Sequence, residues 1–254
     1  YETEYLFKKW GANTIFLPYA ANPYLFKPTP IQTEVRNCVG FIGSLYGNRP
    51  SIINSLTRNS IPVQLYTKLT SLNNINENPL IKHVKKMRHS LNYFSNLVRF
   101  PIGRKCIEGT LRKGFSNLNQ ESLEQNDFVK INDRVSFSEM IKLYSELALS
   151  LNSIELLDTY VLKKPILKTH LRVFEVPMCG GAQLTKRTNE IQSYFQEDKE
   201  VLLYDTIDEL VDKTKFYLNN SDLIKKIKIS ARNRSVESHT WKDRFFKLHE
   251  RLFD

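Results

Sequence analysis

The sequence predicts an α/β fold in which a Rossmann-like parallel sheet is flanked by helices. Strand and helix patterns alternate along most of its 254 residues, and this alternation is typical of parallel sheets because each strand needs a crossover to the next. Two capping boxes, Ser136 with Glu139 and Thr206 with Glu209, mark helix starts. A hydrophobic fraction of 41% with 15 Phe and 12 Tyr indicates a packed core and excludes a disordered chain.

The first part of the chain has the pattern of a connection between two units. We expect a helix over 1–10, a short strand over 13–17 and an extended connector over 18–30, where four prolines disfavour a helix. The predicted organisation is the end of a preceding domain with its linker over 1–36, a Rossmann-like domain over 37–236, and a C-terminal helix over 237–254 that packs back toward the first domain.

A glycine-bearing turn follows the first strand of the predicted sheet. The apolar run 38–42 ends at Gly43, and a helix begins with Asn48 as its N-cap. Residues 61–66 supply the next strand, which completes a βαβ opening.

This turn is a candidate anion site because its backbone N–H groups can approach a phosphate at a helix N-terminus. Gly43, Ser44 and Arg49 are the residues concerned, with Arg49 adding charge. The glycine spacing matches neither GxGxxG nor a Walker loop, so a tight turn without a ligand explains the pattern equally well.

The second half of the predicted domain continues the alternation. The remaining strands are expected at 148–152, 182–185 and 200–204, and the remaining helices after Ser136, at 168–178, after Thr206, at 221–235 and at 240–252. Asn152 ends a strand and therefore stands where open α/β sheets bind ligands, although a turn-forming Asn is an equal alternative.

The segment KTHLRVFEVPMCGGAQLT, residues 168–185, concentrates charged and small residues. If residues 168–178 form a helix, then Lys168, Arg172 and Glu175 share one face. The carboxylate could accept both hydroxyls of a ribose while the two cations neutralise a diphosphate. An exposed ion-pair ladder is the alternative interpretation.

Several classes of protein are disfavoured by composition. Three widely spaced cysteines without a CxxC pair predict a reducing, cytoplasmic compartment and neither disulfides nor a zinc site. No His pair at metal-binding spacing is present, so we predict no metal and no cofactor. No apolar run is long enough to span a membrane.

The net charge of +10 is concentrated in residues 82–113, which hold nine Lys or Arg against the single acid Glu108. A nucleic-acid or polyanion site is one explanation, but no nucleic-acid motif is present and we expect no nucleic-acid partner. A solvated face is the other explanation. A patch for acidic lipid would give peripheral contact at the inner membrane face.

The string LRVFEVPMCGGAQLTKRTNEIQSYFQEDKEVLLYDTIDELVDKTKFYLNN, continuing to SARNRSVESHTWKDRF, resembles the carboxyl-terminal half of the CgeB-like (spore maturation protein type) glycosyltransferases. VGFIGSLYGNR and GANTIFLPYAANPYLFKP are similar to that family's second-domain opening and its crossover. The resemblance implies the second half of a GT-B fold, a retaining glycosyltransferase of the hexosyltransferase type, and an acceptor-binding domain upstream of Tyr1. The donor is then a nucleoside diphosphate sugar, while the acceptor (glycan, lipid-linked or protein) stays open.

By this resemblance Arg172 and Glu175 are catalytic, with Glu175 on the donor ribose and Arg172 facing the diphosphate. The candidate donor-binding residues are Gly43, Ser44, Arg49, Asn152, Lys168, Gly180, Gly181, Gln183, Leu184 and Thr185. Many relatives carry a second glutamate eight positions earlier, where this chain has Leu167. A nucleotide-binding module without catalysis therefore stays an alternative.

Overall fold

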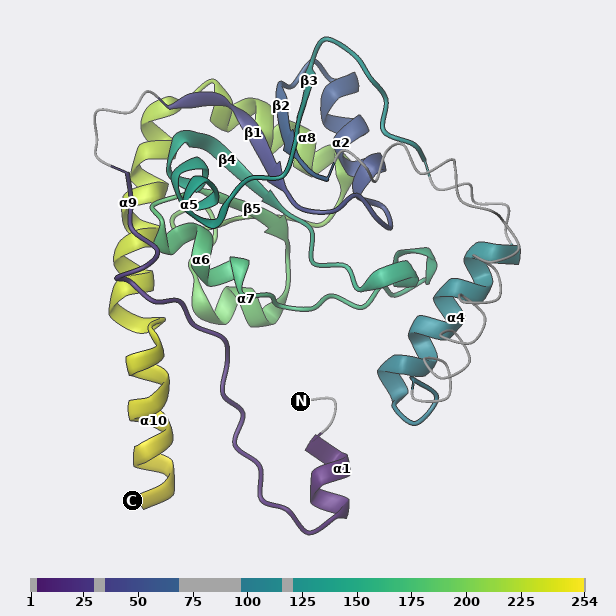
Figure 1. Cartoon of the computed structure of the whole chain (residues 1–254), viewed down its shortest axis with the longest axis vertical. Helices are drawn as coiled ribbons and strands as arrows, with labels where there is room; N and C mark the ends of the chain where they lie inside the picture. The colour runs from purple at the N-terminus through teal and green to yellow at the C-terminus, as the bar shows by residue number, and fades with distance from the viewer. Residues whose placement is uncertain (1–3, 30–34, 69–96, 116–120, 254) are drawn as a thin grey trace.

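One parallel sheet forms the centre of the structure, a computed structural model that describes residues 4–29, 35–68, 97–115 and 121–253 (Figure 1). Its strand order is β3-β2-β1-β4-β5-β6, and every neighbouring pair is parallel. The strands are β1 Arg36–Ile42, β2 Val63–Tyr66, β3 Val129–Asn132, β4 Leu147–Asn152, β5 Gln183–Lys186 and β6 Leu202–Tyr204. The predicted α/β class with a Rossmann-like parallel sheet is confirmed.

Helices cover both faces of this sheet. The helices are α1 Glu4–Lys9, α2 Arg49–Arg58, α4 Pro101–Phe115, α5 Phe137–Glu146, α6 Arg172–Met178, α7 Asn189–Tyr194, α8 Ile207–Leu218, α9 Ser221–Ser238 and α10 Trp241–Phe253, with a 3-10 helix η2 at Leu157–Val161. α2 and α8 share a buried apolar cluster on one face, while α5, α6 and α7 contribute to a second cluster. α10 continues beyond α9 away from the sheet, and α4 packs against η2 at the side of the domain (Figure 1).

The capping residues named from the sequence begin the two helices that they were expected to begin. Ser136 forms a complete capping box, because the Glu139 N–H donates to its Oγ at 3.3 Å and its own N–H donates to the Glu139 carboxylate at 2.9 Å. At α8 the Glu209 N–H donates to Thr206 Oγ1 at 3.1 Å, but the Glu209 carboxylate accepts from the Asp205 N–H at 2.8 Å. In the second capping box the Glu209 carboxylate therefore accepts from Asp205, the residue before the N-cap, and not from Thr206 itself.

Two local predictions, those for residues 13–17 and for the start of the helix at 168, were wrong. Residues 13–17 are irregular chain and not a strand, since no described strand lies beside them to supply a hydrogen-bond ladder. Asn48 is the N-cap of α2, as expected, although its side chain makes no cap hydrogen bond. The helix expected over 168–178 begins only at Arg172, because residues 167 and 168 run alongside residues 154 and 155, with the Leu167–Glu155 bridge and a bond from the Lys168 N–H to the Ile154 carbonyl at 2.9 Å.

The basic stretch 82–113 is only partly described. Residues 82–96 lie outside the described part of the chain, and the remainder includes most of α4. Glu108 pairs with Arg112 and Lys113 with Asp158 in η2. Gly109 permits this packing, because a Cβ there would stand 2.7 Å from the Asp158 carbonyl oxygen. This part of the basic stretch thus holds a helix against the domain.

Candidate functional site

The strand order places one topological switch point at the carboxyl edge of the sheet, and we call the residues at this edge between β1 and β4 the crevice. The chain runs from β1 outward to β3 on one side and from β4 outward to β6 on the other, so β1 and β4 flank the topological switch point. Open α/β sheets bind ligands at this point. Gly43 directly follows β1, and Asn152 is the last residue of β4. The two predicted residues therefore border the same crevice.

Arg172 lies over the turn that follows β1. As the first residue of α6 it extends its guanidinium toward Gly43, and two of its nitrogens would lie 3.5 and 3.7 Å from a Cβ added there. A Cβ at this position would be in ordinary van der Waals contact with the guanidinium. The absence of a side chain at Gly43 thus leaves the Arg172 nitrogens next to bare backbone at the switch point.

Further positive charge gathers around His170. Burial lowers the pKa of His170, and the charges of Lys168, Arg172 and Arg49 lower it further, in that order. Three cations thus add to the effect of burial on the pKa of His170. Within the described part of the chain, none of these three cations forms an ion pair with a carboxylate.

Arg49 also stabilises the turn that precedes α2, besides supplying charge. Its side chain is 6% exposed, its Nη1 donates to the Ser44 carbonyl at 2.8 Å, and its Nη2 donates to the Tyr46 hydroxyl at 2.8 Å. The guanidinium also stacks on the Tyr46 ring, 3.7 Å from its centre. Burial is the main cause that lowers the pKa of Arg49. These contacts of Arg49 thus hold the turn between Gly43 and α2 in place.

Glu175 lies one turn after Arg172 on α6. Its carboxyl is partly buried, and this burial raises its pKa while the nearby Arg172 charge opposes the rise. The two residues do not come within ion-pair distance of each other. The ladder of Lys168, Arg172 and Glu175 that the sequence allowed is therefore not formed, and Lys168 lies exposed before the helix.

Two of the five other candidate residues lie at the opposite edge of the sheet. Gly180 and Gly181 precede β5 and so lie at the opposite, amino-terminal edge of the sheet. Gly180 adopts φ +72°, and a Cβ on Gly181 would stand 2.6 Å from the Tyr144 carbonyl oxygen. Both glycines thus serve the turn from α6 into β5.

The three candidates in β5 are internal to the sheet. Gln183 and Leu184 are 1% and 0% exposed, and Thr185 Oγ1 donates to the Asn152 carbonyl at 2.9 Å. Asn152 is itself buried at 3% exposure. These residues hold β4 and β5 together behind the crevice.

Three residues of the crevice were missed from the sequence as site residues: Tyr46, Glu155 and His170. Glu155 is 4% exposed, accepts from Ser153 Oγ at 2.9 Å, and its charge raises the pKa of Arg49. Its signal was its place three residues after the end of β4. His170 and Tyr46 gave no signal beyond their proximity to Arg172 and Arg49.

Among the described residues, no group of three or more His, Cys, Asp or Glu side chains is placed to hold a metal ion. No helix in the same part of the chain is long and apolar enough to cross a bilayer. Independence from a metal stays a prediction.

The fold and the residues at its switch point together define a Rossmann-like domain with a cluster of cationic side chains at the carboxyl edge of the sheet. A family model described as glycosyl transferase-like matches residues 109–250, more than half of the chain. The chain therefore belongs to this glycosyl transferase-like family. None of the curated proteins matches it in sequence.

Solved structures of similar shape agree with this family. They include sucrose-phosphate synthase from Thermosynechococcus elongatus (15% identity, TM-score 0.56, covering 99% of this chain and 56% of that chain). HepE from Anabaena, in complex with UDP-glucose, is 12% identical with a TM-score of 0.57. The match covers 98% of this chain and 61% of the HepE chain. A glycosyltransferase from Rickettsia africae is 12% identical with a TM-score of 0.57. The match covers 98% of this chain and 59% of the Rickettsia chain. The chain thus spans about 56 to 61% of the length of these structures.

Proposed function

We propose that this chain is the donor-binding half of a glycosyltransferase and that it binds a nucleoside diphosphate sugar at the switch point. One observation carries the proposal: Arg172, Lys168 and Arg49 converge on the carboxyl edge between β1 and β4, and no described carboxylate pairs with them. Cations left unpaired in a crevice match the charge of a diphosphate.

Each central residue has a distinct chemical role in this proposal. Glycosyl transfer develops negative charge on the departing diphosphate, and pre-positioned cations stabilise that charge in the transition state. Arg172 is the principal cation, since its guanidinium lies against bare backbone at Gly43. Glu175, whose carboxyl receives no hydrogen bond from a described residue, accepts the hydroxyls of the donor ribose.

The choice of donor follows from the structural neighbours. HepE has been solved with UDP and with UDP-glucose, so a uridine diphosphate sugar is the first donor to test. The resemblance to CgeB-like enzymes adds two finer proposals: residues 37–236 form the donor domain, and transfer retains the anomeric configuration. NMR of the glycoside product would decide between retention and inversion once an acceptor is known.

Calorimetric titration with UDP, GDP, ADP and inorganic diphosphate tests the donor site. Arg172→Ala should lower the affinity for both UDP and diphosphate by about a hundredfold, because two charge-assisted hydrogen bonds are lost. Glu175→Ala should lower the affinity for UDP and leave the affinity for diphosphate unchanged, because the proposed partner of Glu175 is the ribose.

Arg134→Ala, which removes an exposed arginine after β3 at the outer end of the sheet, with β2 between β3 and β1, is the matched control and should bind like the parent chain. A folded chain that binds none of the nucleotides would refute the donor site. So would equal losses in Arg172→Ala and Arg134→Ala.

A catalytically inactive module would give the same binding results. Release of the sugar from a bound nucleotide sugar, measured with and without a candidate acceptor, separates a transferase from such a module.

A further inference from the structure

The carboxylate of Glu190 joins α7 to the loop that carries Lys168 and His170. Thr169, which stands between these two residues, donates from its Oγ1 to one oxygen of that carboxylate at 2.6 Å. Thr169 is only 8% exposed, so water competes little for this hydrogen bond. Glu190 is therefore attached directly to the segment that contributes to the cationic cluster of the crevice.

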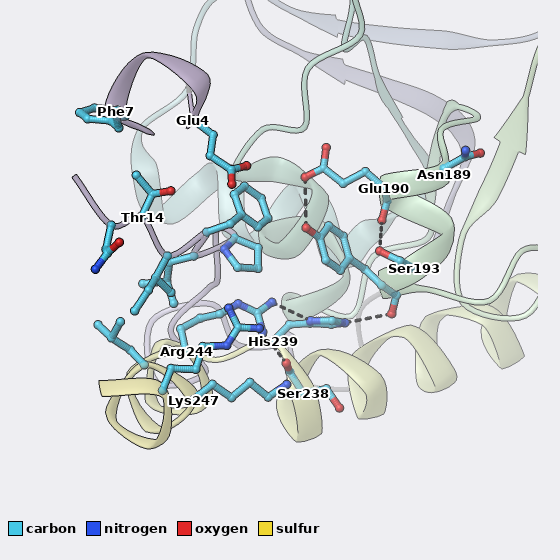
Figure 2. A pocket seen from close by; sticks show the side chains of 18 of the residues that line it. Glu4, Phe7, Thr14, Asn189, Glu190, Ser193, Ser238, His239, Arg244 and Lys247 are labelled. Carbon is cyan, nitrogen blue, oxygen red and sulfur yellow. Dashed lines mark hydrogen bonds between the residues drawn. The ribbon is translucent and has the colours of Figure 1, made fainter. Parts of the chain in front are cut away.

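The other oxygen of the Glu190 carboxylate is held by Tyr194, whose hydroxyl donates to it at 3.1 Å (Figure 2). The Tyr194 ring packs against Phe174 of α6, with the ring centres 5.2 Å apart. The Tyr194 carbonyl bonds to His239 Nε2, at the end of α9, at 2.9 Å. Both carboxylate oxygens thus have a partner, and the second partner is itself fixed from two helices.

Neither helix capping nor charge pairing explains this carboxylate. α7 is capped by Thr188, whose Oγ1 accepts from the Ile191 N–H at 3.1 Å. Within the described part of the chain, no basic side chain forms an ion pair with Glu190. The described groups that shift the pKa of His170 are three cations, and Glu190 is not one of them. Glu190 therefore acts on the loop through its hydrogen bond to Thr169.

We propose that Glu190 is a positioning residue of the donor site, because its carboxylate fixes the loop 168–171 through Thr169. This inference rests on the proposed donor function. The Lys168 N–H bonds to the Ile154 carbonyl at 2.9 Å, so the loop is attached to the segment after β4 at one residue and to α7 at the next. A loop fixed in this way loses less conformational freedom when a ligand binds, and affinity rises accordingly.

The ring of His170 reports the position of the loop in the free chain. Burial is the largest cause that lowers its pKa. Glu190→Ala releases the loop and exposes the ring, so this pKa should rise toward its ordinary value in an NMR titration of the histidine rings. Glu190→Gln should leave it unchanged, because an amide accepts from Thr169 and donates to Tyr194. An unchanged His239 ring shows that the end of α9 stays folded.

Calorimetric titration with UDP and with inorganic diphosphate measures the effect on the donor site. Glu190→Ala and Thr169→Val should each lower both affinities by about tenfold. The double variant should lose little more than either single variant, because both remove the same hydrogen bond. Thr169→Val also repeats the test without altering α7.

Ser193→Ala is the matched control for these variants. Ser193 Oγ donates to the Glu190 backbone carbonyl at 2.6 Å, so this change removes a hydrogen bond of α7 and leaves the carboxylate untouched. It should bind both ligands like the parent chain.

Three results would overturn the role of Glu190: an unchanged His170 pKa in Glu190→Ala, an affinity loss in Glu190→Gln as large as in Glu190→Ala, or losses that add in the double variant. The donor function fails separately. A His170 pKa that rises in Glu190→Ala, in a chain that binds no nucleotide, would refute the donor site and with it the donor role of Glu190, while the attachment of the loop to α7 would stand.

Discussion

Two arginines at the same edge of the sheet have opposite surroundings. Arg187 directly follows β5, and its guanidinium donates to Glu197 at 3.1 Å, to Glu209 at 2.9 Å and also to Asp205. Arg172, near the end of β1, has no carboxylate partner among the described residues. The edge thus contains one neutralised cluster and one cluster with unbalanced positive charge.

The difference separates a structural role from a binding role. The Arg187 guanidinium is the main cause that lowers the pKa of Glu197 to about 2, with Lys213 adding to it. This network ties the loop after β5 to α8. Around Arg172, by contrast, burial lowers the pKa of His170 and the charges of Lys168, Arg172 and Arg49 lower it further.

The largest expected effect concerns the neutralised cluster. Arg187→Ala removes the cation shared by three carboxylates, of which Lys213 still pairs with Glu197 and Glu209, and the arginine side chain is only 24% exposed. We expect the free energy of unfolding to fall by about 3 kcal/mol, measured by urea denaturation at neutral pH. Nucleotide affinity should not change.

Arg58 supplies the control for this loss. It also pairs with two carboxylates, those of Glu121 and Glu124, but its side chain is 50% exposed. Solvent screens such pairs, so Arg58→Ala should cost much less stability. Equal losses in the two variants would show that burial does not distinguish the clusters. A loss of UDP binding in Arg187→Ala would erase the contrast with Arg172.

Arg49 is intermediate between the two arginines, since it is bonded to the Ser44 carbonyl and Tyr46 and yet contributes charge to the crevice. Arg49→Lys keeps the charge and removes the fork and the stacking on Tyr46. We expect UDP affinity to fall by about tenfold at most, less than in Arg172→Ala. An affinity loss as large as that of Arg172→Ala would identify Arg49 as a direct ligand of the diphosphate.

The sequence predicted the sheet well where strand and helix periods were long and capped. β1, β4, β5 and β6 and the helices after Ser136 and Thr206 were expected close to their observed positions. β3 was missed, because Val129–Asn132 is short and lies at the sheet edge, where only β2 pairs with it. Its existence depends on a partner that is distant in sequence.

The candidate site was predictable only in part for the same reason. The position of Gly43 and Asn152 at strand ends follows from local patterns, and Arg172 stands in a charged motif. Gly180 and Gly181 belong to that motif too, but the direction of β5 places them at the opposite edge. The role of His170 depends on charges from three separate positions, which no local spacing reveals.

The smallest expected effect is a pH dependence that uses His170 as a probe of the unbalanced charge. In the free chain its pKa lies below the ordinary value, through burial and then through Lys168 and the two arginines. A bound diphosphate offsets those cations and raises this pKa, so the complex takes up a proton. Affinity for UDP-glucose, whose diphosphate does not titrate near neutral pH, should therefore rise several-fold as the pH falls below neutral.

His239 is the matched control for this measurement. Burial lowers its pKa to about 4, and its ring is fixed between the Tyr194 carbonyl and Arg244, both at 2.9 Å. Histidine ring resonances followed by NMR should show the His170 pKa rising on addition of UDP-glucose while that of His239 stays unchanged. His170→Gln should remove the pH dependence of binding. If the His170 pKa does not move in a saturated complex, the diphosphate does not lie among these cations, and the contrast between the two ends of the sheet edge would need another cause.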